Sequence, residues 1–148
     1  MERLETLEAI LERLRKKIRE CGLKNSKQRE EILVVLYKSG THLSPEEIAQ
    51  QIRLTDKSAS LSSVYRLLSF LEQNDFISGL KTNQGGKHYE IASKFHHDHI
   101  ICLECGEITE FVDEEIERLQ LEIAKKFNAK LMSHDMRLFV KCEKCQKA

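Results

Sequence analysis

Apolar residues recur at helical spacing through the first half of the chain. In the range 2–20, a leucine returns every three or four residues and an isoleucine completes the series, which predicts an amphipathic helix. A second helix is expected from near Asn25, where Gln28 stands at the third position of a capping box. A fourth is expected over 61–71, after a polar stretch over 55–60.

The start of the third helix carries the clearest local signal. Ser44 is a favoured N-cap residue, Pro45 suits the first helical position, and Glu47 completes a capping box. The helix is expected to end near Arg53. The first half of the chain is therefore predicted to be mainly α-helical.

Two strand-like runs follow, over 76–82 and 88–92, and a glycine-containing segment over 83–87 predicts the turn between them. Helices followed by a small hairpin indicate a winged helix-turn-helix, mainly α with a small β wing. A generic three-helix module is the alternative.

The pattern changes again after Ala92 and predicts an α+β module, in which Asp113 caps a further helix. We expect one domain over 1–92, with 1–20 as an extra N-terminal helix, a hinge over 93–95, and a second domain over 96–148. Four short strands are expected in the second domain, over residues 99–103, 107–112, 129–133 and 136–141.

Basic and acidic residues balance, 24 against 24, so the net charge selects no class of partner. Their distribution is uneven, because residues 13–29 hold eight basic residues and one acidic residue, a local charge of +7. That segment is either a footprint for a polyanion or a solvated helix face. No apolar run is long enough to span a membrane and no signal peptide is recognisable, so a cytoplasmic protein without membrane contact is expected.

Four of the five cysteines form two C-x2-C pairs, Cys102 with Cys105 and Cys142 with Cys145. In a reducing compartment, such pairs favour zinc over disulfides. Four thiolates make a closed tetrahedral site, which indicates structural rather than catalytic zinc. Four ordinary buried thiols would be the alternative, but these seldom occur at such spacing.

Just before the first pair, four ligand-type residues stand in a row, His96, His97, Asp98 and His99. In an extended strand, alternate residues face opposite ways, so His97 and His99 point to one side and His96 and Asp98 to the other. One short strand could therefore feed two metal sites. Mixed imidazole and carboxylate ligands suit Fe(II), Zn(II), Mn(II), Co(II) or Ni(II). Further donors lie elsewhere in the chain, at His42, Glu90, Glu110, Glu117 and His134.

The start of the fourth predicted helix has the side chains of a nucleic-acid reader. Small hydroxyl residues such as Ser62 and Ser63 at a helix N-terminus can approach phosphates closely. Tyr65 and Arg66 are long enough to reach base edges in a major groove. In the alternative interpretation, Tyr65 is a half-buried packing residue and Arg66 a solvated charge.

These motifs together resemble the ferric uptake regulator (Fur) family over roughly residues 20–148. The resemblance implies a winged-helix DNA-binding domain followed by an α+β dimerisation domain. It also implies a cytoplasmic, metal-dependent transcriptional repressor that binds double-stranded operator DNA as a homodimer, and it leaves a tetramer open. The motifs that carry it are Gly22-Leu23-Lys24 ahead of Lys27-Gln28-Arg29, Ser63-Val64-Tyr65-Arg66, His96-His97-Asp98-His99-Ile100-Ile101-Cys102, and Cys142-Glu143-Lys144-Cys145.

Carried over by position, the resemblance implies three metal sites and a set of DNA contacts. Lys24 would reach a minor groove, and Tyr65 and Arg66 the bases of the adjacent major groove. Structural zinc would be held by Cys102, Cys105, Cys142 and Cys145. A regulatory ion would be held by His42, Glu90, His97, His99 and Glu110. An additional ion within the dimerisation domain would be held by His96, Asp98, Glu117 and His134.

Two features refine the effector that the resemblance implies. Peroxide-sensing relatives usually carry aspartates where Glu90 and Glu110 stand, so the glutamates favour the iron branch, with Fe(II) as effector and Zn(II) or Mn(II) as surrogates. The long helix over 1–20 resembles the extended N-termini of a subset of iron regulators. His88 is not part of the family pattern, and we interpret it as a residue of the wing. Peroxide, zinc, manganese or nickel sensing within the family is the alternative.

Two other classes of protein are less consistent with the motifs. A metallohydrolase would need a nucleophile or a pocket for an organic substrate, and no motif supplies either. It would also leave the helix with Tyr65 and Arg66 without a function. The other class is a zinc-stabilised interaction module without DNA binding. We therefore expect a regulator that is not an enzyme and has no small organic substrate.

Overall fold

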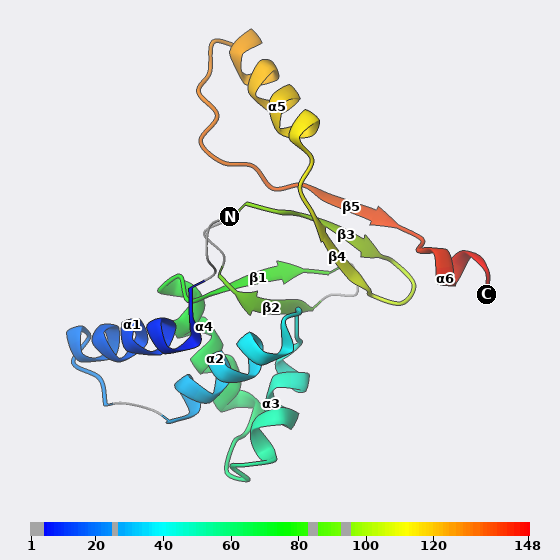
Figure 1. The fold of residues 1–148 in the computed structure, drawn as a ribbon. Helices are drawn as coiled ribbons and strands as arrows, with labels where there is room; N and C mark the ends of the chain where they lie inside the picture. Colours follow the sequence, from blue (N-terminus) through cyan, green and yellow to red (C-terminus); the bar gives the residue numbers. More distant parts are fainter. Residues whose placement is uncertain (1–4, 25–26, 83–85, 93–95) are drawn as a thin grey trace. The chain divides into compact units, whose positions relative to one another are not determined.

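The computed structural model covers residues 1–148 and describes all of them except 1–4, 25–26, 83–85 and 93–95 (Figure 1). The chain divides into two compact units, Met1–Ser93 and Lys94–Ala148, called here the first and second units. The expected hinge over 93–95 lies outside the described residues. Within the described part, no helix is both long and apolar enough to cross a membrane.

The first unit is built on helices that begin at side-chain caps. Thr6 accepts a hydrogen bond from the backbone N–H of Ala9, and Ser44 and Ser60 each form a capping box. The Ser44 box is the one that the sequence predicts. Asn25 of the other expected box lies outside the described residues. The four helices are α1 (Leu7–Glu20), α2 (Lys27–Ser39), α3 (Pro45–Arg53) and α4 (Leu61–Gln73).

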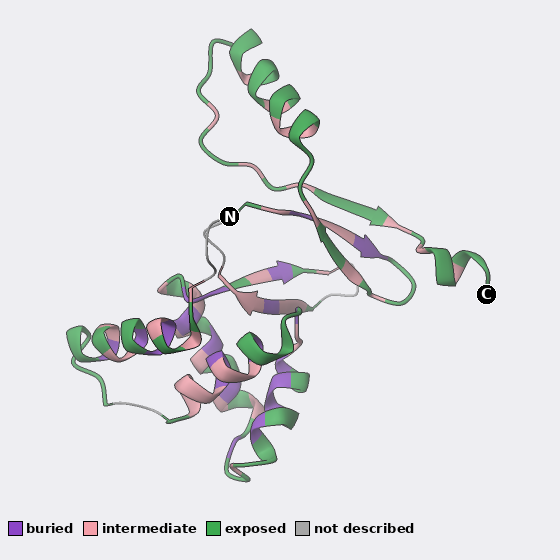
Figure 2. Ribbon diagram, in the orientation of Figure 1, coloured by how far each residue is buried: buried purple, intermediate pink, exposed green. Residues whose placement is uncertain are grey.

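One hydrophobic core joins all four helices of the first unit to its hairpin. The apolar stripe of α1 belongs to this core, because Leu14 and Ile18 are almost fully buried (Figure 2). The extra N-terminal helix is therefore a part of the unit rather than an appendage to it. Burying such side chains stabilises a fold by about 1.5–3 kcal/mol each.

The hairpin consists of β1 (Ile77–Lys81) and β2 (Lys87–Ile91), which pair antiparallel with Ile77 opposite Ile91. Leu43, between α2 and α3, forms a further antiparallel bridge with Tyr89 of β2. Part of the expected turn, 83–85, lies outside the described residues. Four helices and a small antiparallel hairpin agree with the winged-helix prediction.

The second unit contains strands β3 (Asp98–Cys102), β4 (Ile108–Phe111) and β5 (Arg137–Val140), which form one sheet in the order β4-β3-β5. Its central strand pairs antiparallel with β4 and parallel with β5. Helix α5 (Glu114–Lys126) connects β4 to the segment before β5, and Asp113 caps it as predicted. Helix α6 (Glu143–Gln146) follows β5.

The structure of the second unit differs from the sequence prediction in two places. Residues 129–133 form no strand. A strand needs a hydrogen-bonding partner, and in the described part of the chain residues 129–133 pair with neither edge strand of the sheet, β4 or β5. Helix α6 was missed, because four residues are too few to show helical periodicity.

Candidate metal centres and nucleic-acid interface

The four cysteines of the second unit meet because two parallel strands end side by side. Cys102 closes β3 and pairs in register with Val140 of β5, so Cys142 follows nearby. After Cys102 the chain turns through Gly106, whose φ of 75° is easily adopted only by glycine, and the N–H of Gly106 donates to the carbonyl of Cys102. Both C-x2-C pairs therefore reach one point.

The sulfur positions fit a tetrahedral ion. The Sγ atoms of Cys102 and Cys145 are 3.8 Å apart, and those of Cys105 and Cys142 are 3.7 Å apart. All four sulfurs lie within 4.8 Å of one another, and none forms a disulfide. Thiolates about 2.3 Å from a tetrahedral zinc lie roughly 3.8 Å from each other, so the donor set suits Zn(II).

The backbone around Cys102 favours a thiolate there. Hydrogen bonds from the backbone of Cys105 and then Cys142 lower the pKa of the Cys102 thiol to about 6. The pKa of Cys145 is raised, first by its contact with the Cys142 sulfur and then by burial. Thiolates are the form that binds metal, so the lowered pKa of Cys102 favours coordination by this residue.

A second group of donors lies wholly within the second unit. His96 Nε2 is 3.0 Å from Asp98 Oδ1 and 3.3 Å from Glu117 Oε1. His134 Nε2 is 3.2 Å from the same Glu117 oxygen and 3.6 Å from the same Asp98 oxygen. Asp98 comes from β3, Glu117 from α5, and His134 from the segment between α5 and β5.

The polar atoms of this group have few other partners. Asp98 is completely buried. Within the described part of the chain, three buried atoms form no hydrogen bond of good geometry: Asp98 Oδ2, Glu117 Oε1 and His134 Nε2. The last two have ion-pair contacts with other members of this group. Burying such atoms without hydrogen bonds is costly unless an ion compensates them. The four side chains therefore fit a cation with mixed nitrogen and oxygen ligands.

The five residues expected at the regulatory site are divided between the units. In the first unit, His42 Nε2 lies 3.1 Å from Glu90 Oε2. The bridge between their neighbours causes this approach, since the N–H of Leu43 donates to the carbonyl of Tyr89 over 2.9 Å and the reverse bond is 2.7 Å long. His42 is buried, so its position is well constrained.

The second unit places the other three expected ligands together. His97 Nε2 is 3.5 Å from Glu110 Oε1, and the rings of His97 and His99 lie 4.9 Å apart. Residues 99 and 110 are directly opposite each other in the β3–β4 register. Each unit thus carries an incomplete group of imidazole and carboxylate donors.

The start of α4 presents polar side chains to solvent and apolar ones to the core. Val64 and Leu68 are fully buried, whereas Ser62, Tyr65 and Arg66 are exposed. Tyr65 is 45% exposed, which argues against a purely packing role. The hydroxyl of Ser63 is engaged in the helix cap, because it donates to the Ser60 carbonyl and accepts from the Ser60 N–H.

The segment before α4 is tied to α2. Asp56 accepts a hydrogen bond from Gln28 Nε2 over 2.9 Å and another from the Ser58 N–H over 2.9 Å. The hydrogen bonds from Ser58 and then Gln28 lower the pKa of the Asp56 carboxyl. Arg53 Nε donates to the Ala59 carbonyl. These contacts fix the position at which α4 begins, and no pattern in the sequence predicts them.

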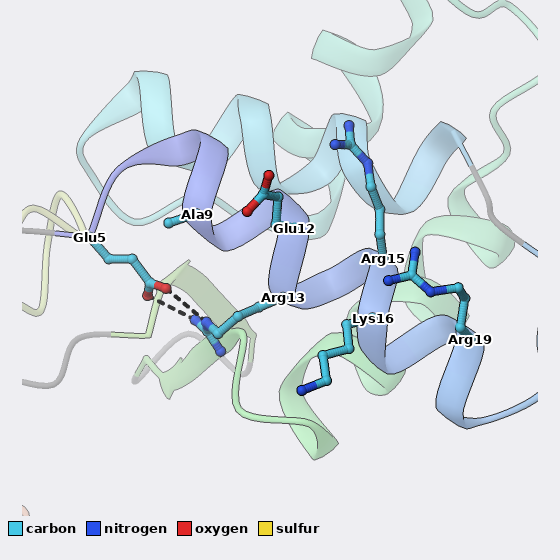
Figure 3. A pocket seen from close by; sticks show the side chains of 7 residues that line it. All are labelled: Glu5, Ala9, Glu12, Arg13, Arg15, Lys16 and Arg19. Carbon is cyan, nitrogen blue, oxygen red and sulfur yellow. Dashed lines mark hydrogen bonds and ion pairs between the residues drawn. The ribbon is translucent and has the colours of Figure 1, made fainter.

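The basic segment over 13–29 is less available than its charge suggests. Arg13 makes a bidentate contact with Glu5, and both residues line a pocket beside α1 (Figure 3). Arg15 makes another with Glu30 of α2, and Arg29 lies over the ring of Phe70. Lys27 pairs with Glu31. The basic residues of this segment without an ion pair to another described residue are Lys16, Lys17, Arg19, Lys24 and Arg29.

Comparisons with known proteins agree with this architecture. The model of the Ferric uptake regulator family matches residues 20–139. The chain is 64% identical over 148 residues to the ferric uptake regulation protein of Helicobacter pylori, which covers 100% of this chain and 99% of that protein.

Two solved structures extend the likeness to three dimensions. The ferric uptake regulator of Helicobacter pylori, reported to have three functional metal binding sites, matches with a TM-score of 0.95 and 64% identity over 100% of this chain and 99% of that one. A ferric uptake regulator of Francisella tularensis with iron matches with a TM-score of 0.79 and 34% identity, over 84% of this chain and 96% of that one. These likenesses confirm the predicted fold class, a winged helix followed by an α+β unit.

Proposed function

Because the chain belongs to the ferric uptake regulator family, we propose that it is an iron-responsive, metal-dependent transcriptional repressor that controls genes of iron uptake and homeostasis. It would act in the cytoplasm as a homodimer on double-stranded operator DNA, and not as an enzyme. One observation carries the proposal: imidazole and carboxylate donors form an incomplete group in each of the two units.

The divided donor set supplies a means of coupling metal to DNA. His42 and Glu90 belong to the first unit, which contains α4, the helix proposed to contact DNA bases. The second unit contains His97, His99 and Glu110. These residues would hold one Fe(II) only in an arrangement that brings both groups to it. Metal loading would therefore favour that arrangement. DNA and metal must then strengthen each other's binding to the same degree.

The other two groups would have supporting roles. Cys102, Cys105, Cys142 and Cys145 would hold structural zinc, because four thiolates leave no open coordination position. A further ion would be held by His96, Asp98, Glu117 and His134, all within the second unit.

DNA would be contacted by the first unit and dimerisation would involve the second. Ser62 and Ser63 would lie against phosphates, and Tyr65 and Arg66 against base edges, with Lys24 in the adjacent minor groove. In a two-fold symmetric dimer, the two α4 helices would meet the two half-sites of an operator. Each phosphate contact from Lys16, Lys17 or Arg19 of α1 would make binding more sensitive to salt.

The coupling is tested with two neighbouring histidines. His97→Ala removes one proposed regulatory ligand. The Fe(II) concentration needed for half-maximal binding to the operator of an iron-uptake gene should therefore rise by about tenfold or more. The measurement is DNA binding against buffered Fe(II) under anaerobic conditions, with zinc content checked by mass spectrometry.

His96→Ala is the matched control, because it removes an imidazole from the same strand but from the other donor group. It should leave the Fe(II) dependence close to that of the wild type. If His97→Ala bound operator with an unchanged Fe(II) dependence, the coupling role of the divided donor set would be wrong.

A further inference from the structure

The first turn of α3 carries two exposed acidic residues with different contacts. The carboxylate of Glu47 accepts a hydrogen bond from the Ser44 N–H over 2.8 Å and closes the capping box. The carboxylate of Glu46 reaches the neighbouring helix α4, where it accepts a hydrogen bond from the Tyr65 hydroxyl over 3.3 Å. Glu46 thus contacts a side chain that we assign to DNA reading.

Both partners of this contact stand on well-anchored backbone. Ile48 and Ala49, which follow the two glutamates in α3, are buried in the core. Val64, which directly precedes Tyr65 in α4, is buried as well. Partial burial and then the charge of Glu46 raise the pKa of the Tyr65 phenol, so its hydroxyl stays protonated and can donate. The exposed ring therefore has one polar anchor on a fixed neighbouring helix.

We propose that Glu46 is a positioning residue for Tyr65, and that their hydrogen bond raises the discrimination between operator and random DNA. The inference rests on the proposed function, because it requires Tyr65 to face bases. A ring that is already oriented loses less conformational freedom when it binds. Its apolar contact with base edges depends on sequence, whereas random DNA is held through phosphates and does not need the ring.

A simpler role for Glu46 is electrostatic. An acidic residue in the first turn of a helix interacts favourably with the helix dipole, and it would repel the phosphates of DNA. Both effects act on operator and random DNA alike, and Glu47 shares them. Glu47→Gln removes the same charge from the same turn, and glutamine can still complete the capping box. It is therefore the matched control for charge.

Two duplexes are needed for the measurement. One is the duplex that the wild-type protein enriches from a random library in the presence of Mn(II), and the other is an unselected random duplex. The readout is the ratio of the two affinities for the full-length, Mn(II)-loaded protein. Circular dichroism and thermal midpoints check that every variant is folded.

Glu46→Ala and Tyr65→Phe should each lower this ratio by about 3- to 10-fold, the range for one hydrogen bond. The double variant should lose no more than either single variant, because both changes remove the same contact. Glu46→Gln, which keeps an oxygen acceptor, should retain most of the ratio, and Glu47→Gln should retain all of it.

An unchanged ratio in Glu46→Ala would overturn the proposal, and so would multiplied losses in the double variant. Equal losses in Glu46→Gln and Glu47→Gln would reduce Glu46 to a surface charge. If the wild-type protein enriched no duplex from the library, the proposed function itself would fail. If it enriched one and Glu46→Ala behaved as wild type, only the positioning role would fail.

Discussion

The two units of this chain are stabilised in different ways. In the first unit, helices α1–α4 and the hairpin share one core of 17 buried residues. In the described part of the second unit, only Ile101 and Cys102 are buried hydrophobic residues, and α5 buries none (Figure 2). The first unit has the core of an ordinary small domain, whereas the second must gain stability from elsewhere.

The second unit has metal-ligating side chains and exposed apolar surface in place of a large core. Two complete donor groups lie within it, the four cysteines and the group around Asp98. Small units with little core commonly depend on metals or on association. Its exposed large apolar residues are Leu103, Val112, Leu119, Leu121, Ile123, Phe127, Met132, Leu138 and Phe139.

Removal of zinc should produce the largest difference in stability between the two units. Structural zinc contributes about 10–16 kcal/mol of apparent binding free energy, which in such sites is folding free energy. Chelation, or Cys142→Ser, should therefore abolish protection from amide hydrogen exchange in β3 and β5. Helices α1–α4 should keep theirs, because their core contains no metal ligand from the cysteine group.

Mass spectrometry of peptides from the full-length protein can measure both units in one experiment. Cys21→Ser is the control, since Cys21 is exposed and belongs to the first unit. It should leave exchange in both units as in the wild type. Unchanged protection of β3 and β5 after zinc removal would mean that the second unit folds without its metal.

The opposite selectivity is expected for a core substitution in α1. Leu14 is fully buried. Leu14→Ala should lower the free energy of unfolding of the first unit by about 2–5 kcal/mol, because it removes buried apolar volume and leaves a cavity. Exchange in the second unit should not change. Denaturant titration and hydrogen exchange measure the two effects.

Leu54→Ala is the matched control, because Leu54 lies in the same unit but is 78% exposed. It should change stability by no more than about 0.5 kcal/mol. Equal effects of the two substitutions would show that α1 contributes little to the core and is dispensable for the fold.

Local signals in the sequence predicted most of the fold. The Ser44–Glu47 capping box and the leucine spacing of α1 depend only on nearby residues, and the structure has both. The strand expected over 129–133 was wrong because strand formation depends on a partner elsewhere in the chain. For the same reason, the bidentate pair between Arg15 and Glu30 could not be anticipated.

The site shows the same division between local and distant information. Strand alternation predicts that His96 and Asp98 face one way and His97 and His99 the other, and in the structure each pair lies together. The hydrogen bonds from Gln28 to Asp56 and from Tyr65 to Glu46 join residues far apart in sequence. Only the packing of the helices brings these partners together.

The smallest expected effect concerns what covers the second unit. Leu119, Ile123 and Phe127 recur every four residues along α5, so they form one apolar stripe, and all three are exposed. Under the proposed function, a second copy of the chain covers this stripe. Symmetry then places each substitution in the interface twice.

Ile123→Ala should weaken the dimer by about 1–2 kcal/mol, or roughly tenfold in the dissociation constant, because apolar side-chain surface is lost from the proposed interface in both copies. Alanine preserves the helix, so the loss reports on the interface. Sedimentation equilibrium of the metal-loaded protein measures it. Lys125→Ala, on the polar side of α5 near the Arg118–Glu122 pair, is the control and should leave the dimer intact. An unchanged dissociation constant for Ile123→Ala would mean that the dimer leaves this stripe uncovered.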